Sequence, residues 1–492
     1  MNLANVFGDQ LIDCCHIGIL HTLRAHIKTT IPNNLASNTP LSYNLPMKKF
    51  PFVLLLSLAC LAGCSSPAPE SSSPLNTDVT SPSAVDNLDG EFPVVQEDEP
   101  RVSYQASFVE NDLHEDPKVY KDTLAYFCLT TTIYDTEEYV TTQLNNAHFE
   151  NIRFVSNNNY GETGHCLASR KMNGFYLILA LCQSMEYRAQ WGDNLRLGAH
   201  GDPEGWTEET AYFINRIEDY MKGFDGYKTK ILITGYSRGA AVTSLTAAAL
   251  SKQNKYGWGE NDIYAYAFEG PDHAEEEGNY PFIHDIHNSE DFVVNMLPKA
   301  YGFKRHGTHK DIGGTDLYVR AMNATFPDYP VAAFNGKGYF ENNEAFIDGI
   351  GKMLTDPFPE YANYSLETRE DYVKNVQDGL STLMAVLFQN GTTYLLESLE
   401  GFEMGMSQIL VAISSEAKFR SFIQSVFDYA HFVYTDAQLD IITSQLYVLG
   451  YNLASYRLDM IMKVAAVMKE NATYVAHSHY PETTYALLKY QG

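Results

Sequence analysis

Basic residues are scarce in this sequence of 492 residues. Lys and Arg number 34 against 61 Asp and Glu, which gives a formal net charge of −27. A chain this acidic repels phosphate backbones, so we expect no nucleic acid among its partners. Charged residues make up only 19% of the chain and hydrophobic residues 45%, which supplies enough apolar mass for a large core. A mainly disordered chain is therefore excluded.

Cysteine is also sparse, and its spacing excludes the common zinc motifs. None of the seven cysteines stands in a C-x-x-C pair or at zinc-ligand spacing from a histidine. The sequence therefore predicts no metal site. Cys128, Cys166 and Cys182 follow the export signal described next. Three thiols allow at most one disulfide beside one free cysteine.

The apolar run at 50–61 is too short for a comfortable membrane span. It follows Met-Lys-Lys at 47–49 and ends in Leu-Ala-Gly-Cys at 61–64, the order of regions in a secretory signal. The last four residues resemble a bacterial lipobox, whose cysteine is lipid-modified. We therefore expect export, with a lipid on Cys64 that anchors the chain to a bacterial membrane, facing the exterior or the periplasm. An ordinary cleaved signal or a plain buried cysteine is the alternative.

This signal sets expectations for the residues around it. A signal peptide works at an N-terminus, so we expect Met47 to be the true start and residues 1–46 to lie upstream of it. Residues 47–64 are then the signal peptide with its lipobox. Residues 65–103 are rich in Ser, Pro, Asp and Glu, which predicts a disordered tether to a folded body.

From 104 to 339 the sequence predicts an α/β core. Short continuous apolar runs are typical of strands buried on both faces of a sheet, and the segments between them have helical spacing. Strands are expected at 175–181, 230–234, 263–268 and 282–286, and helices at 208–223 and 239–250. Strands that alternate with helices favour a mainly parallel sheet with helices on both faces.

Residues 340–470 differ from this core, because they show long helical periodicity and no strong strand. Helices are expected here at 416–432 and 436–469, among others. We interpret the segment as a large helical insertion packed over the sheet, which serves either as a lid or as additional core. Residues 471–492 are expected to return to the α/β core.

The pentapeptide Gly235-Tyr-Ser-Arg-Gly239 lies between a predicted strand and a predicted helix. G-x-S-x-G in this position is typical of a nucleophile elbow, a turn so sharp that it presents the serine at the carboxyl edge of the sheet. Ser237 is then the nucleophile, and the amide of Arg238 points into the same space and can bind an oxyanion. The alternative is a tight glycine turn with an inert serine.

A serine nucleophile needs a base, and the base needs an orienting acid. In α/β-hydrolases the acid follows a later strand, and the histidine follows the acid. Asp291 lies in the loop after the strand at 282–286 and is our candidate acid. Glu290 and Asp285 compete with it, although Asp285 lies within the strand, where an inward carboxylate would be costly.

The candidate base is His479, with His477 as the alternative. Both lie near the C-terminus, where a loop can return to the sheet edge after the helical insertion. His306 and His309 follow Asp291 too closely to have crossed to the next strand. His431 falls in an expected apolar helix, where a structural histidine is more common.

Three segments together resemble the class 3 lipases, and more closely the secreted lipase-like proteins of bacteria in that family. They are GYSRG with its following alanines, HNSEDFVVNMLPKAYGFKRHG from His287, and HYPETTY from His479. The resemblance covers roughly 120–310 and 470–490. It implies an α/β-hydrolase fold, ester hydrolysis without a cofactor, and a triad of Ser237, Asp291 and His479.

One segment departs from the family pattern. Members usually carry Arg-Gly-Thr after the strand that matches 175–181, and that Thr helps to form the oxyanion hole. Here the strand runs into Cys182-Gln183-Ser184. Ser184 can replace the Thr as an oxyanion donor, but the glycine is gone. Loss of one such donor costs roughly 10²–10³ in turnover.

These observations together predict a serine carboxylic ester hydrolase with an ester or lipid substrate, held at the membrane by the lipid on Cys64. Two alternatives stay open. One is an esterase that deacylates polysaccharides. The other is a catalytically weak hydrolase-fold protein that binds a ligand or partner.

Overall fold

The computed structural model describes residues 85–92, 102–133, 136–155, 164–182, 201–291, 294, 303–314, 317–329, 411–412, 414–456 and 477–491, with a few helical residues between 375 and 386. These residues belong to two compact units. One unit joins residues 63–343 to 473–492, and the other includes residues 344–472.

A seven-stranded sheet forms the centre of the first unit, in the order β11-β10-β9-β8-β7-β6-β5. Its strands are β5 (Glu150–Val155), β6 (His165–Met172), β7 (Phe175–Cys182), β8 (Thr229–Tyr236), β9 (Ile263–Phe268), β10 (Ile283–His287) and β11 (Thr308–Asp311). Strands β7 to β11 are parallel to one another, and β5 and β6 are antiparallel. The predicted α/β class with a mainly parallel sheet is confirmed.

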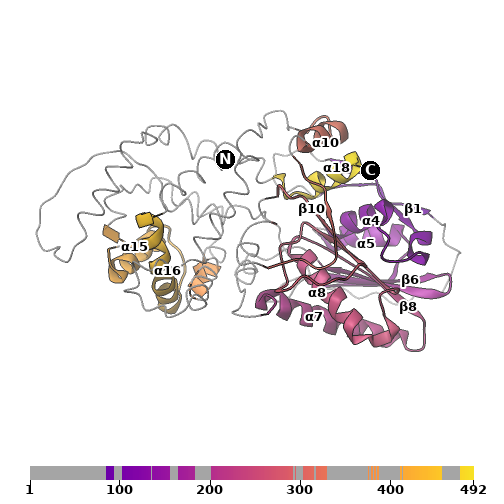
Figure 1. The fold of residues 1–492 in the computed structure, drawn as a ribbon, viewed down its shortest axis with the longest axis horizontal. Helices are drawn as coiled ribbons and strands as arrows, with labels where there is room; N and C mark the ends of the chain where they lie inside the picture. Colours follow the sequence, from indigo (N-terminus) through magenta and orange to yellow (C-terminus); the bar gives the residue numbers. More distant parts are fainter. Residues whose placement is uncertain are drawn as a thin grey trace, which may run out of the picture. The chain divides into compact units, whose positions relative to one another are not determined.

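Helices cover both faces of this sheet (Figure 1). Helices α4 (Asp122–Thr132) and α5 (Glu137–Asn146) lie on one side, and α7 (Glu204–Met221) and α8 (Arg238–Gln253) on the other. The core on the α7 and α8 side includes Phe213, Ile217, Ile231, Ile233 and Ile283, all fully buried. Because the central strands are buried on both faces, they appear in the sequence as continuous apolar runs.

Sequence periodicity located the central elements well and the peripheral ones poorly. The strand expected at 263–268 has those bounds in the structure, and the other three differ by at most two residues at either end. Strands β5, β6 and β11 were not predicted. Polar residues break the apolar runs in all three strands: they lie at exposed or half-buried positions in β5 and β11, whereas in β6 His165, Ser169 and Arg170 are polar and nevertheless buried.

Ordered structure begins at Val85, inside the segment 65–103 that was predicted to be a disordered tether, so the predicted end of the tether at 103 is wrong. Two short antiparallel pairs occur here, β1 (Val85–Asn87) with β4 (Ser107–Val109), and β2 (Gly90–Glu91) with β3 (Ser103–Tyr104). Leu88 and Phe92 are buried, and the Phe92 ring packs against Tyr104 and Tyr485. These few apolar side chains suffice to hold a segment whose overall composition is polar.

The remaining elements of the first unit are short helices and the closing helix. They are η2 (Glu110–His114), η3 (Lys222–Phe224), η4 (Lys255–Gly257), α10 (Leu317–Thr325) and α18 (Pro481–Gln491). Helix α18 buries the seven residues 482–488. The C-terminal segment is thereby held in the core of the first unit.

The second unit is helical where it is described. Its two long helices are α15 (Glu416–Tyr429) and α16 (Asp436–Tyr456). Both begin at the expected residues, 416 and 436, α15 ends three residues before the expected 432, and residues 457–469 lie outside the described part of the chain. They pack on each other through rings such as Phe419 and Tyr447. Within the described part of the chain, no helix combines the length and apolarity that crossing a membrane requires.

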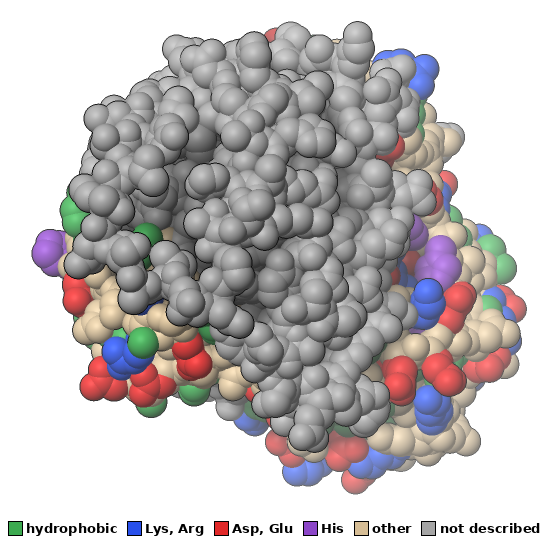
Figure 2. Space-filling view, turned by 60° about the vertical axis from the view of Figure 1, so that its left-hand side comes forward, with side chains coloured by type: hydrophobic (Ala, Val, Ile, Leu, Met, Phe, Trp, Pro, Cys, Tyr) green, Lys and Arg blue, Asp and Glu red, His purple; other side chains and the backbone are tan. Residues whose placement is uncertain are grey.

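The surface and the thiols complete the description. On the coloured part of the face shown in Figure 2, acidic and basic side chains are mixed. Cys128, Cys166 and Cys182 are all buried and free, so none of the three forms a disulfide. Burial raises the pKa of each thiol, which makes these cysteines poor nucleophiles.

Candidate active site

The turn between β8 and α8 holds Ser237 in a strained conformation. Its backbone has φ of 55° and ψ of −123°, which non-glycine residues rarely adopt. A Cβ atom on Gly235 would overlap the backbone of Gly239, so the turn needs glycine there. A strained serine between strand and helix, at the carboxyl edge of a mostly parallel sheet, is the arrangement of the α/β-hydrolase fold.

Three side chains from distant parts of the sequence meet at this turn. The Ser237 hydroxyl lies 2.8 Å from Nε2 of His479. Nδ1 of the same imidazole lies 2.5 Å from Oδ2 of Asp291. Asp291 is fully buried, whereas the His479 side chain is 17% exposed. The hydroxyl therefore shares a hydrogen bond with an imidazole whose other nitrogen faces a buried carboxylate.

Each partner of Ser237 is held by its own backbone contacts. Asp291 follows β10 in a turn closed by the hydrogen bond from its amide to the Asn288 carbonyl at 2.9 Å. The Tyr236 hydroxyl donates to the His479 carbonyl at 2.7 Å, so the residue before the serine positions the histidine. The Asn288 side-chain amide donates to the Ser478 carbonyl at 3.4 Å and joins the two loops.

Glu269 is a buried acid beside this group that the sequence analysis missed. Its Oε2 accepts from the Asn288 amide at 2.8 Å, and its Oε1 accepts from the Thr484 hydroxyl at 2.9 Å. Burial, and next the negative charge of Asp291, raise the pKa of Glu269 well above its ordinary value. Glu269 thus braces the loop of Asp291 against the helix that follows His479. The sequence did contain one sign of its importance: Glu269 directly follows the strand at 263–268, and Ser237 and Asp291 also lie just beyond strand ends.

Arg238 plays two separate structural roles. It is the first residue of α8, so its amide lies at the helix N-terminus, where the helix dipole favours negative charge. Its guanidinium points away to a buried ion pair with Glu209 of α7, with Nη2 at 2.7 Å from Oε1. This pair ties α7 to the start of the helix that supports the serine.

The other two acids considered for the role of Asp291 have different surroundings. Asp285 is fully buried within β10, and its Oδ2 lies 2.8 Å from Nδ1 of His309. Glu290 neighbours Asp291, and burial, followed by the negative charge of Asp311, raises its pKa to about 7. The carboxylate that meets Nδ1 of His479 is that of Asp291.

The other histidines are likewise accounted for by different contacts. His477 packs its ring against Tyr329 and Tyr480. His306 accepts a hydrogen bond from the Gly278 amide at 3.0 Å. His431 does not lie within an apolar helix as expected, because α15 ends at Tyr429 and His431 is exposed with φ of 54°. Ser184 and Cys64 lie outside the described residues.

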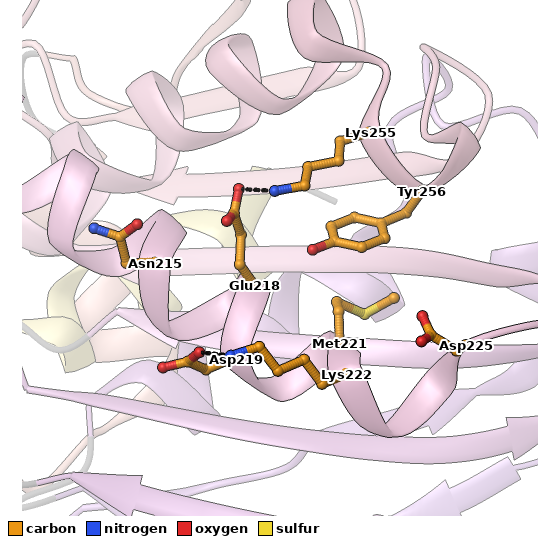
Figure 3. A pocket seen from close by; sticks show the side chains of 8 residues that line it. All are labelled: Asn215, Glu218, Asp219, Met221, Lys222, Asp225, Lys255 and Tyr256. Carbon is orange, nitrogen blue, oxygen red and sulfur yellow. Dashed lines mark hydrogen bonds and ion pairs between the residues drawn. The ribbon is translucent and has the colours of Figure 1, made fainter.

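A surface pocket is formed by residues that follow α8 together with the end of α7 (Figure 3). It is lined by Asn215, Glu218, Asp219, Met221, Lys222, Asp225, Lys255 and Tyr256. Ion pairs line its wall, with Lys255 at 2.5 Å from Glu218 and Lys222 at 2.6 Å from Asp219. It lies past the C-terminal end of the 16-residue α8, whose length of about 24 Å separates it from Ser237.

No protein-family model and no curated protein matches this sequence. Solved structures similar to it include a triacylglycerol lipase described as having a serine protease triad as its catalytic centre. That match has 17% identity and a TM-score of 0.30, and covers 40% of this chain and 82% of that one. The Rhizomucor miehei lipase in its propeptide complex matches at 17% identity and a TM-score of 0.29, over 40% of this chain and 70% of that one. A lipase of Yarrowia lipolytica matches at 13% and 0.28, over 39% and 80%. The resemblance to the class 3 family stays a prediction at the level of sequence.

Proposed function

We propose that this chain is a serine ester hydrolase in which Ser237 is the nucleophile, His479 the general base and Asp291 the orienting acid. The observation that carries the proposal is the pair of hydrogen bonds on one imidazole, 2.8 Å to Ser237 Oγ and 2.5 Å to Asp291 Oδ2. The strained elbow supports it further, because such strain persists only where the surroundings enforce it.

The first half of the reaction transfers the acyl group to the enzyme. Ser237 Oγ forms a bond to the ester carbonyl carbon while its proton passes to Nε2 of His479. Asp291 holds the imidazole in the required tautomer and stabilises its positive charge. When the tetrahedral intermediate collapses, the bond to the alcohol oxygen breaks and His479 donates its proton to the departing alcohol.

The second half regenerates the serine. Water attacks the acyl-Ser237 carbonyl and gives its proton to His479, and the acid product leaves as Ser237 recovers the proton. The negative oxygen formed in both halves is stabilised by the Arg238 amide at the start of α8, with Ser184 as the proposed second donor. All of these proton transfers use side chains and water, and the proposed cycle has no step for a cofactor.

We assign the substrate as a carboxylic ester of lipid type, with the helical unit as a proposed lid. An exported location, facing the exterior or the periplasm, suits this substrate, and we propose that a lipid on Cys64 holds the chain at the membrane. A diacylated N-terminus is the two-chain case that anchors stably. Labelled fatty acid added to expressing cells should enter the wild-type protein and not Cys64→Ala; equal labelling of both would refute the anchor.

The catalytic proposal is tested with a fluorophosphonate probe, which forms a covalent bond with activated serines. The full chain should be labelled, and Ser237→Ala should not. Hydrolysis of short acyl esters, emulsified triglyceride and acetylated glycans then separates an esterase, a lipase and a polysaccharide deacylase. A folded wild-type protein that stays unlabelled and hydrolyses none of these esters would leave only a binding role for the fold.

A further inference from the structure

We propose that one face of the neighbouring strands β10 and β11 carries a second site, independent of the esterase proposal, in which Asp285, His287 and His309 bind a divalent transition-metal ion of the zinc class. One ligand atom from each of these side chains lies within 4.8 Å of the others. None of the three serves the proposed ester hydrolysis. His309 and Asp285 were weighed from the sequence only as catalytic candidates.

Strand geometry explains why these residues meet. In the parallel pair, Asp285 lies opposite His309. Side chains two residues apart on a strand share a face of the sheet, so His287 follows Asp285 on that same face. Ile283 starts the series on this face and belongs to the buried core under α7 and α8. Within its five residues, this face of β10 therefore passes from the apolar core at Ile283 to the proposed ligands Asp285 and His287.

The distances are close to those that a small cation imposes. Oδ2 of Asp285 lies 3.0 Å from Nδ1 of His287 and 2.8 Å from Nδ1 of His309. Tetrahedral zinc with bonds of about 2.0–2.1 Å places its ligand atoms roughly 3.3 Å apart. An outward shift of about 0.5 Å for the His309 imidazole and about 0.3 Å for that of His287 would bring both distances from Asp285 to this value.

Donor chemistry favours the zinc class over calcium or magnesium. Two imidazoles and one carboxylate suit zinc and its neighbours, whereas calcium and magnesium take oxygen ligands. Nε2 of His309 lies 3.5 Å from Glu277, and metal-bound histidines commonly donate their second ring nitrogen to a carboxylate. Asp285 is fully buried, and its Oδ1 has no hydrogen-bond partner in the described part of the chain.

The charges around the site leave room for a cation. Arg305 has Nη1 at 3.7 Å from Asp285 Oδ2, and its Nε pairs with Asp272 at 2.7 Å. Counting Asp272, Asp285 and Glu277 against Arg305, the cluster carries two excess negative charges with neutral histidines. A bound divalent ion would cancel this excess and fasten the edge strand β11 to β10.

The test uses the full chain, stripped of metal with a chelator and then titrated with zinc against a chromophoric competitor. We expect one tight site per chain that magnesium and calcium do not compete for. Cobalt should bind at the same stoichiometry and give visible absorption bands of a nitrogen- and oxygen-ligated ion.

Three variants identify the ligands. His309→Ala and His287→Ala should each weaken zinc binding by more than about 100-fold, and Glu277→Gln by about 10-fold as an outer partner. His114→Ala is the matched control, because its side chain is 37% exposed beside Glu110, against 36% for His309. His479→Ala, which removes the other buried His–Asp pair, should also leave the zinc site intact.

Circular dichroism checks that each variant is folded. The proposal is overturned if the folded wild type binds no zinc at one site per chain, or if magnesium or calcium displaces the zinc. It is equally overturned if folded His309→Ala and His287→Ala bind zinc and cobalt as the wild type does.

Discussion

Two histidine–aspartate pairs in the same unit share one geometry and differ in the third group. In both, Nδ1 of a histidine meets Oδ2 of a fully buried aspartate, at 2.5 Å for His479 with Asp291 and 2.8 Å for His309 with Asp285. The far nitrogen of His479 faces a serine hydroxyl, whereas that of His309 faces the carboxylate of Glu277. The pair itself therefore specifies no chemistry. We propose that His479 acts as a general base because a serine hydroxyl faces its second nitrogen. We propose that His309 acts as a metal ligand because His287 and Asp285 lie beside it.

The largest expected effect is the loss of ester hydrolysis when the Ser237–His479 contact is removed. Ser237→Ala and His479→Ala should each lower kcat for a short acyl ester by about 10⁶-fold, since the members of such a set act as a unit. His477→Gln tests the alternative base and should retain most of the activity. If His477→Gln, folded by circular dichroism, lost activity as completely as His479→Ala, the assignment of the base would be wrong.

Replacing Asp291 should lower kcat by a smaller factor than replacing Ser237 or His479. Asp291→Asn keeps the shape of the side chain but favours the wrong imidazole tautomer, and kcat should fall by about 10⁴-fold. Glu290→Gln is the matched control, because it makes the same change at the adjacent position. Equal losses in both variants would show that the loop, rather than the carboxylate on His479, carries the effect.

Replacing Glu269, which braces the loop of Asp291, should mainly lower the free energy of unfolding. Glu269→Ala leaves the Asn288 amide and the Thr484 hydroxyl without their buried acceptor, at a cost of about 1–3 kcal/mol for each such group. Chemical denaturation measures the loss in the free energy of unfolding. Glu269→Gln preserves an acceptor and the volume, so it should lose clearly less. If Glu269→Ala were as stable as the wild type, Glu269 would not brace the Asp291 loop.

The smallest expected effect is on the pH dependence of stability. Because burial and Asp291 raise the pKa of Glu269, the folded state keeps a proton that the unfolded chain releases above its ordinary pKa of about 4.3. The contribution of Glu269 is therefore complete below that pH and declines as pH rises toward the folded pKa. Glu269→Gln cannot lose this proton. The stability of the wild type relative to Glu269→Gln should therefore fall as the pH rises above about 4.3 and level off above the raised folded-state pKa, and a constant difference would contradict the raised pKa.

The central strands and the serine turn were accessible to sequence reasoning because their signals are local. Burial on both faces makes β7, β8 and β9 continuous apolar runs, and glycine is required at 235 because the backbone of Gly239 lies too close for a Cβ atom. The edge strand β11 escaped prediction because its four residues, Thr308 to Asp311, are all polar. The early start of the fold escaped because Leu88 and Phe92 are isolated apolar residues in a polar segment.

Contacts between distant segments were beyond such reasoning. Thr484 and Asn288 donate to Glu269 across separations of 215 and 19 residues. Position after a strand made Glu269 visible in principle, but only these contacts make it a brace. Likewise, His309 was set aside as a base because of its place in the chain, and β11 brings it to Asp285 for a different proposed role.

The sequence by itself determined that the chain folds as a mainly parallel α/β structure with a sharp serine turn, because backbone strain and two-sided burial restrict residue types locally. Only the tertiary structure decided which acid and which histidine lie beside that serine, and that a second histidine–aspartate pair lies near the edge of the same sheet. Hydrogen bonds and ion pairs depend on distances of about 3 Å between atoms. Residues far apart in sequence reach such distances only through the packing of the strands and helices that carry them.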